Sequence, residues 1–315
     1  MKKLLSILLV ILMVTTLTGC GEKRAKFVVG ICQFVQDEPL DKATQGFMDA
    51  LKEELGDEVT FINNNGSGES ANCSVICNDF VTDKVDLIMA NATPALQTAV
   101  SATGSIPILG TSVTNYESAL GISLVNGATG SNVSGTTDLA DLEAQAQMII
   151  DLVPDAKKVG IIYCSSEANS IFQADRVEKY LKDKGLEVNR FTFVNSADLA
   201  EVVGSACTNS DVIYAPTDNA LAAASETVNA ICMQYKKAVI AGEEGLCKGC
   251  GVATLTISYY DLGFATGKMA AKILRGEAKV GEMPIEFCPT ATYKFVADRC
   301  ETLGINVPSD YVEIK

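Results

Sequence analysis

Two short polar segments carry side chains that could bind a small charged molecule. The first is Ala92-Thr93-Pro94, between an apolar run and a helical pattern. A hydroxyl at a helix N-cap, followed by proline, leaves backbone N–H groups and the helix dipole free to bind an anion such as a carboxylate. The second is Pro216-Thr217-Asp218-Asn219, where an acid replaces Thr93 and suits an ammonium. Together the two segments predict a site for a zwitterion.

Further candidate contacts stand on neighbouring loops. A buried ammonium needs an anionic partner, and the second-half loops supply acids. Aromatic side chains at predicted strand ends (Phe34, Tyr116 and Tyr163) would stack on an aromatic ligand or close the core. Thr and Asp are also common helix caps, so a capping role is the alternative for them. The predicted ligand-binding residues are Gln33, Phe34, Thr93, Pro94, Ser112, Tyr116, Glu167, Asn169, Thr217, Asp218 and Glu243.

The elements that position these residues alternate between apolar strands and amphipathic helices. Such alternation predicts βαβ units and parallel sheets. In the first half, the pattern predicts strands at 27–32, 59–62, 86–90 and 106–109, and helices at 40–55, 73–81 and 94–102.

The same pattern occurs twice along the chain. A shift of 130 positions places Val29-Gly30-Ile31 on Val159-Gly160-Ile161, and a shift of 125 places residues 86–90 on residues 211–215. The repeat predicts two similar α/β lobes. Because ligands of open parallel sheets bind beyond the carboxyl ends of the strands, we expect the site in a cleft between the lobes.

The N-terminus has the pattern of a bacterial export signal. Lys2 and Lys3 precede an apolar run at residues 4–14, which is shorter than the ~18 residues typical of a membrane-spanning helix. Leu17-Thr18-Gly19-Cys20 resembles a lipobox, in which the signal is cut before a cysteine that carries a diacylglycerol. We therefore predict a signal peptide at 1–19, lipidation of Cys20 and a tether at 20–26.

Composition excludes several classes of function. The 315 residues carry 39 acids and 25 bases, a formal charge of −14, which removal of Lys2 and Lys3 with the signal changes to −16. Such an acidic chain does not suggest a nucleic-acid partner. Histidine is absent, which removes the usual general base and the commonest metal ligand. Without a P-loop or a G-x-S-x-G motif, the sequence predicts a protein that is not an enzyme and has no cofactor.

Eleven cysteines raise the question of metal binding or disulfides. Cys247 and Cys250 form a CxxC pair, and Cys73 and Cys77 are four apart. A zinc site would need two such pairs brought together by the fold. The alternatives are a Cys247–Cys250 disulfide or thiols buried as small hydrophobic groups.

Several motifs resemble the substrate-binding lipoproteins of a group of bacterial ABC importers, some of them described as tryptophan- or tyrosine-binding. The resemblance covers about residues 26–274. The motifs that carry it are Ala92-Thr93-Pro94-Ala95, Asn132-Val133-Ser134-Gly135, residues 163–170, Pro216-Thr217-Asp218-Asn219 and residues 259–263. One departure is Glu38-Pro39, where members of this family often have a histidine-proline pair.

The resemblance implies a type I periplasmic binding protein fold with two Rossmann-like lobes, parallel sheets and a three-crossover hinge. The crossovers would fall near Ser134–Asp138, Gly242–Gly245 and Met283–Phe287. Lobe one would comprise residues 27–135 plus 245–284, and lobe two residues 136–244 plus 285–315.

The expected function is a monomeric, lipid-anchored binding protein on the extracytoplasmic face of the cell membrane. It would capture an aromatic or other hydrophobic amino acid by hinge closure and deliver it to an ABC permease. The alternatives are a binding protein that serves a sensor, or an importer component for a sugar, nucleoside or peptide.

Overall fold

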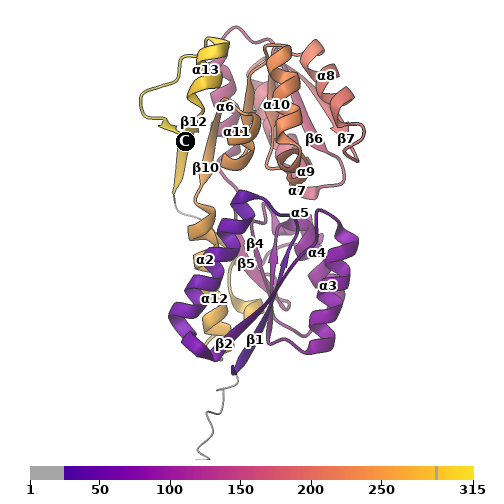
Figure 1. The fold of residues 1–315 in the computed structure, drawn as a ribbon, viewed down its shortest axis with the longest axis vertical. Helices are drawn as coiled ribbons and strands as arrows, with labels where there is room; N and C mark the ends of the chain where they lie inside the picture. Colours follow the sequence, from indigo (N-terminus) through magenta and orange to yellow (C-terminus); the bar gives the residue numbers. More distant parts are fainter. Residues whose placement is uncertain (1–24, 288–289) are drawn as a thin grey trace, which may run out of the picture.

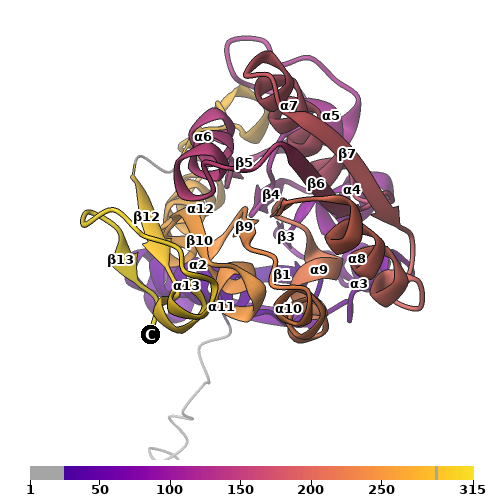
Figure 2. The same ribbon diagram turned by 90° about the horizontal axis from the view of Figure 1, so that it is seen from above.

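The computed structural model describes residues 25–287 and 290–315, which form two lobes stacked along the longest axis (Figure 1). The predicted signal peptide, Cys20 and most of the predicted tether lie outside the described residues. In each lobe, helices cover both faces of a sheet (Figures 1 and 2). The prediction of two α/β lobes is confirmed.

Lobe one contains a six-stranded parallel sheet in the order β11-β5-β4-β3-β1-β2. Its strands are β1 (Phe27–Gln33), β2 (Val59–Asn65), β3 (Leu87–Asn91), β4 (Ile108–Thr111), β5 (Val133–Thr137) and β11 (Glu286–Phe287). Its helices are α2 (Glu38–Leu55), α3 (Ser70–Asp83), α4 (Thr93–Ala102), α5 (Tyr116–Leu120) and α12 (Tyr259–Leu274), with short 3₁₀ turns at Gly56–Glu58 and Val280–Glu282.

Lobe two contains a seven-stranded sheet in the order β13-β12-β10-β9-β8-β6-β7, in which the pair β10–β12 is antiparallel and the other pairs are parallel. Its strands are β6 (Lys158–Cys164), β7 (Glu187–Phe193), β8 (Val212–Ala215), β9 (Val239–Ala241), β10 (Ala253–Ile257), β12 (Ala291–Phe295) and β13 (Val312–Glu313). Its helices are α6 (Leu142–Leu152), α7 (Ala168–Asp183), α8 (Leu199–Asn209), α9 (Asn219–Ala223), α10 (Ser225–Gln234), α11 (Glu244–Cys250) and α13 (Ala297–Leu303).

The two sheets repeat one topology. The order β5-β4-β3-β1-β2 in lobe one corresponds strand for strand to β10-β9-β8-β6-β7 in lobe two. The internal repeat read from the sequence therefore corresponds to two copies of one structural unit. Because corresponding strands end on the side that faces the other lobe, corresponding loops meet between the lobes (Figure 1).

The crossovers at which the chain passes from one lobe to the other, called passages below, lie in part at other positions than predicted. The first lies at residues 138–141, between β5 and α6, close to the predicted Ser134–Asp138. The second lies at Ser258 rather than at Gly242–Gly245, because β10 is the fifth strand of the second repeat and pairs with β9 in lobe two. Residues 245–257 thus belong to lobe two.

The third passage also lies later than predicted. β11 still pairs with β5 of lobe one, at the predicted position of the crossover, Met283–Phe287. β12 then pairs with β10 of lobe two, so the chain changes lobes between Phe287 and Ala291. Lobe one accordingly includes residues 258–287 rather than 245–284.

Helices α2 and α12 lie side by side along lobe one (Figure 1). Their backbones approach so closely that a Cβ at Gly263 would collide with the Ala43 carbonyl, and one at Gly46 with the Tyr260 carbonyl. Only glycine permits this approach. This packing holds Tyr259, which follows the second passage, next to α2, which follows β1.

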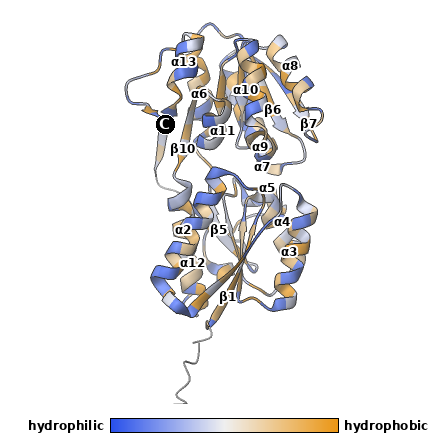
Figure 3. Ribbon diagram, viewed as in Figure 1, coloured by the Kyte–Doolittle hydropathy of each residue, from blue (hydrophilic) through white to orange (hydrophobic). Residues whose placement is uncertain are grey.

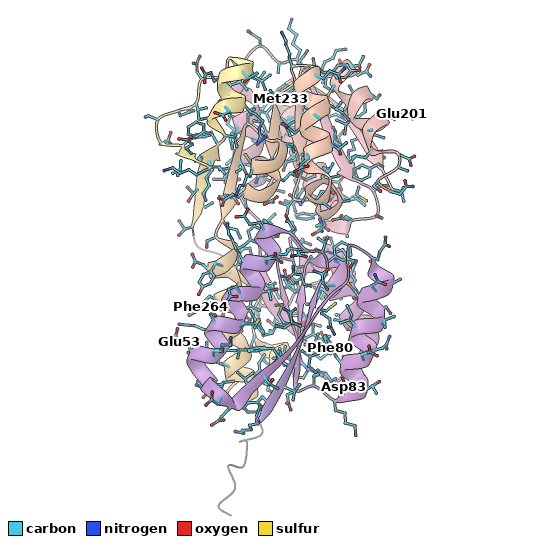
Figure 4. All side chains as sticks on the ribbon, viewed as in Figure 1. Glu53, Phe80, Asp83, Glu201, Met233 and Phe264 are labelled. Carbon is cyan, nitrogen blue, oxygen red and sulfur yellow. The ribbon has the colours of Figure 1, made fainter. Side chains whose placement is uncertain are left out.

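Apolar residues line the strands and the inner faces of the helices, whereas polar residues cover the outer faces (Figure 3). Phe80 on α3 is fully buried, and its ring packs on Gly30 of β1, where a Cβ would overlap it. Asp83 at the end of the same helix is exposed (Figure 4). Among the described residues, no helix is long and apolar enough to cross a membrane.

The nine cysteines in the described ranges are buried and free. Cys247 and Cys250 lie on one short helix, α11, without a bond between them. Within residues 25–287 and 290–315, no group of three or more potential His, Cys, Asp or Glu ligands could hold a metal ion. Of the three alternatives, the structure supports buried thiols that act as small hydrophobic groups.

Candidate ligand site between the lobes

A small cavity of about 20 Å³ lies between the two lobes. This space accommodates about one water molecule and is far too small for an amino acid, so a ligand can enter only when the lobes move apart. Residues from both lobes and from the first passage line it: Asp37, Pro39, Leu40, Thr93, Ser112, Thr114, Asp138, Asn169, Thr217, Asp218, Asn219, Ala222, Glu243 and Tyr259.

A larger groove of about 580 Å³ lies beside the passages, between α2, α12, β10 and β12. Four of its five charged side chains form ion pairs, Lys42 with Glu38 and Lys294 with Glu244. The groove shares Pro39 and Tyr259 with the small cavity, but the loops after β3, β4 and β8, which carry Thr93, Ser112 and Asp218, do not line it. We therefore assign the ligand site to the smaller cavity.

The lobe-one wall presents hydroxyl groups without partners. Thr93 is the first residue of α4, and Ser112 follows β4. The Thr93 Oγ1 and Ser112 Oγ atoms are buried and make no hydrogen bond. Ala92 and Ser112 have φ angles of 89° and 54°, which are strained for residues with a Cβ. Strained backbone and unpaired hydroxyls at two strand ends are typical of a binding site.

The hinge contributes a carboxyl group. Asp138 directly follows β5 at the start of the first passage. The Tyr259 hydroxyl donates a hydrogen bond of 3.0 Å to Asp138 Oδ2, whereas Asp138 Oδ1 is buried and has no partner. Burial raises the pKa of the Asp138 carboxyl, whereas the side chains of Thr114 and Tyr259 act in the opposite direction.

The lobe-two wall contains Asp218 at the N-cap of α9. Its Oδ1 accepts from Leu221 N at 2.8 Å, and its Oδ2 accepts from Cys164 N and Ser170 Oγ, both at 2.7 Å. Burial raises the pKa of Asp218 to about 7, with a further contribution from the neighbouring Glu167 carboxyl. Asp218 therefore lines the cavity and also holds three elements of its own lobe together.

Glu243 and Asp37 add two more carboxyls from opposite lobes. Glu243 caps α11 by accepting hydrogen bonds from Gly245 N and Leu246 N. Burial, together with a smaller contribution from the nearby Asp37, raises the pKa of Glu243 to about 8. Burial also raises the pKa of Asp37 to about 6. The cavity is thus strongly acidic, and its lining contains no Lys or Arg.

Six predicted ligand residues line this cavity: Thr93, Ser112, Asn169, Thr217, Asp218 and Glu243. Three others face the interior of lobe one. The Gln33 side chain donates to Asp41 at 2.6 Å and accepts from Thr44 at 2.7 Å, which fastens α2 to β1. Phe34 packs in the hydrophobic core, and Pro94 is buried in the first turn of α4.

The remaining predicted residues also have structural positions. The Tyr116 hydroxyl donates to the Thr136 carbonyl at 3.0 Å inside lobe one. Tyr163 packs in the core of lobe two and receives a hydrogen bond from Arg190. Of the two roles predicted for these rings and Phe34, the structure supports closure of the core, because each strand-end ring turns into the core of its own lobe.

Glu167 lies at the N-cap position of α7 and bonds to the start of α9 instead of reaching the cavity. Its carboxylate accepts from Ala220 N at 3.0 Å, from Asn219 N at 3.1 Å and from Asn169 Nδ2 at 3.1 Å. These bonds hold the cavity-lining residues Asn169 and Asn219 in place. The role of Glu167 is therefore to orient the lobe-two wall of the cavity.

Sequence reasoning missed Asp37, Thr114, Asp138 and Tyr259. Asp138 and Tyr259 follow strands that end at passages between the lobes, and both lie at or next to motifs noted in the sequence, so their place at the hinge was the available signal. The acid singled out instead, Glu38, is half exposed and pairs with Lys42 at 2.8 Å outside the cavity. Asp37, one position earlier, is the residue that lines it.

Comparison with known proteins agrees with this geometry. The family model of the ABC transporter substrate binding proteins matches residues 28–310. A tyrosine-binding protein of Clostridioides difficile is 34% identical over 303 residues, which cover 90% of this chain and 87% of that protein. The chain belongs to the ABC transporter substrate-binding protein family, whose members bind ligands and are not enzymes, as predicted.

Two solved structures extend the comparison. An ABC domain from Streptococcus pneumoniae in complex with L-Trp is 29% identical, with a TM-score of 0.87 over 92% of this chain and 99% of that one. The ligand-free, open structure of a substrate binding protein from Clostridium difficile is 32% identical, with a TM-score of 0.71 over the same shares. The lobes have the type I periplasmic binding protein fold, as predicted.

Proposed function

We propose that this protein is the extracytoplasmic substrate-binding lipoprotein of an ABC importer and that its ligand is an amino acid. The observation that carries the proposal is the cavity between the lobes, with unpaired hydroxyls on lobe one and carboxyls at the hinge and on lobe two. Hydroxyls and the N-terminus of α4 suit a carboxylate, and the acids suit an ammonium. The names of the relatives, which bind tyrosine or tryptophan, support an amino-acid ligand.

An aromatic or other hydrophobic side chain is the proposed third part of the ligand. Pro39, Leu40, Ala222 and the ring of Tyr259 supply apolar surface in the lining. Burial of an aromatic side chain removes ~150–250 Å² from water. At ~25 cal/mol/Å², this burial contributes about 4–6 kcal/mol before ordering costs, enough to support binding.

Binding proceeds by hinge closure in this proposal. The ligand enters between separated lobes, contacts one wall, and the second lobe closes over it. The size of the cavity supports this sequence, because about 20 Å³ admits no amino acid without lobe movement. The higher similarity to the L-Trp complex than to a ligand-free, open relative supports an arrangement close to the closed state.

The N-terminal signal and Cys20 complete the proposal. Cleavage before Cys20 and its lipidation would anchor a monomeric protein to the outer face of the cell membrane, beside the permease that receives the ligand. Mass spectrometry of the protein from membranes tests this part. A mature N-terminus at a diacylated Cys20 is expected, and an unmodified chain that keeps residues 1–19 would contradict it.

The ligand is tested by thermal unfolding of residues 21–315 against the twenty amino acids, several sugars and several nucleosides. A ligand at 100 times its Kd stabilises the protein by about 2.7 kcal/mol, which is measurable. We expect the largest shift with tyrosine, tryptophan or phenylalanine. Shifts with sugars or nucleosides alone would contradict the amino-acid assignment.

A further inference from the structure

We propose that Asp138 at the hinge, and not Asp218 on lobe two, is the carboxylate that receives the ammonium of the ligand. The inference rests on the proposed function and identifies which of the acids in the same cavity makes the contact. A residue on the passage between the lobes, rather than on a lobe-two loop, then determines that the ligand must carry an amine.

The hydrogen bonds of Asp218 argue against a primary role in ligand contact. Both of its oxygens are occupied by donors of its own lobe, namely Cys164 N, Ser170 Oγ and Leu221 N. A fully buried carboxylate with three such donors is already stabilised as a structural cap. An ammonium added to it would gain less than at a carboxylate with a free oxygen.

Glu243 is in a similar position. Each of its carboxylate oxygens accepts one backbone N–H of α11, from Leu246 and Gly245. The residue fixes the start of that helix at the cavity edge. The lobe-two acids thus combine a lining position with a capping role that does not require a ligand.

Asp138 differs because one of its oxygens has no partner. Tyr259 occupies Oδ2 at 3.0 Å and orients the carboxyl, whereas Oδ1 is buried and unpaired in the cavity lining. A buried unpaired carboxylate oxygen is costly, and a charged donor from a ligand would offset that cost. Its environment is thus incomplete without a ligand.

A second unpaired acceptor lies on the opposite wall. Asn169 on α7 donates its Nδ2 to Glu167 and to the Thr217 carbonyl, at 3.1 and 2.9 Å, which leaves Oδ1 buried without a partner. Asn169 and Asp138 line the same cavity of about 20 Å³. One ammonium can therefore donate to Asp138 at the hinge and to Asn169 of lobe two, which makes the contact dependent on lobe closure.

The experiment measures binding by calorimetry for the parent protein, Asp138→Asn and the matched variant Asp218→Asn, all as residues 21–315. The probes are L-tyrosine and L-tryptophan, each paired with its deaminated analogue, desaminotyrosine or indole-propionate. Asparagine keeps the size of the side chain and still accepts from Tyr259. Thermal unfolding of each variant checks that it is folded.

We expect Asp138→Asn to weaken amino-acid binding by about 10- to 100-fold and to leave the binding of the deaminated analogues unchanged. Asp218→Asn is expected to lower the unfolding temperature and to weaken binding less. An Asp138→Asn variant that still prefers the amino acid to its analogue as strongly as the parent overturns this inference alone. A parent that binds none of the amino acids overturns the proposed function.

Discussion

The two walls of the cavity differ in how completely their polar groups are satisfied. On lobe two, Asp218 and Glu243 cap the helices α9 and α11 and accept hydrogen bonds from their own lobe. On lobe one and the hinge, Thr93 Oγ1, Ser112 Oγ and Asp138 Oδ1 are buried without partners. Similar polar residues thus have different roles, and the unpaired ones are those whose environment a ligand would complete.

The strongest test of this difference is removal of the Asp218 carboxylate. Asp218→Ala leaves two backbone N–H groups and one hydroxyl unsatisfied in a buried site, so we expect the free energy of unfolding to fall by roughly 2–4 kcal/mol. Urea unfolding of the ligand-free protein measures it. Asp198 at the N-cap of α8 makes no capping bond, and Asp198→Ala serves as the control with little change expected.

The converse test removes hydroxyls from the lobe-one wall. Thr93→Val keeps the shape of the side chain, and Ser112→Ala removes only an oxygen. Because neither hydroxyl has a partner, we expect unfolding free energies within about 0.5 kcal/mol of the parent and amino-acid affinities about tenfold weaker. A loss of stability without a loss of affinity would show that these hydroxyls serve the fold.

A third test uses pH. Burial raises the pKa of Glu243 to about 8, of Asp218 to about 7 and of Asp37 to about 6. The folded protein then keeps protons that the unfolded chain has already lost, so the contribution of these three groups to the stability of the ligand-free protein is greatest at low pH. It should fall as pH rises from about 4 to about 8, by about 1.4 kcal/mol per pH unit for each carboxyl that is protonated in the folded protein and ionised in the unfolded chain.

Urea unfolding of the ligand-free protein across this pH range measures the slope. Glu243→Gln removes the group with the highest of these pKa values and should flatten the decline between about pH 6 and pH 8. A parent whose stability rises with pH over this range would show that the carboxyls are ionised and paired in the absence of ligand.

The smallest effect is expected at the ion pair between the lobes. Lys248 of lobe two lies 3.2 Å from Glu38 of lobe one, and both side chains are about half exposed. Exposed pairs contribute little because water and salt screen them. Glu38→Gln should therefore change ligand affinity by less than about twofold, and a tenfold loss would show that this pair controls closure.

The sequence predicted the architecture well because it depends on periodicity and repetition. Alternating strands and helices, and the correspondence of Val29 with Val159, were sufficient for two similar lobes. The second passage was misplaced because nothing local distinguishes a strand that ends a lobe from one that continues it. Only pairing with β9 shows that residues 253–257 remain in lobe two.

The site was predicted less completely for a related reason. Loop positions follow from strand ends, which located Thr93, Ser112 and Asp218 at the cavity. The direction of a side chain depends on tertiary packing, which turned Tyr116 into the core of lobe one. The importance of Asp138 lies in an oxygen that received no donor, and residue types alone do not count donors.

The central claim, that the lobes close on an amino acid, is tested most directly by small-angle X-ray scattering of residues 21–315. The radius of gyration would be measured without ligand and with the amino acid that gives the largest thermal shift. The account predicts a smaller radius with the ligand, because the ligand-free protein must separate its lobes to admit an amino acid and the bound ligand then holds the lobes closed. Saturating binding with an unchanged radius would contradict closure.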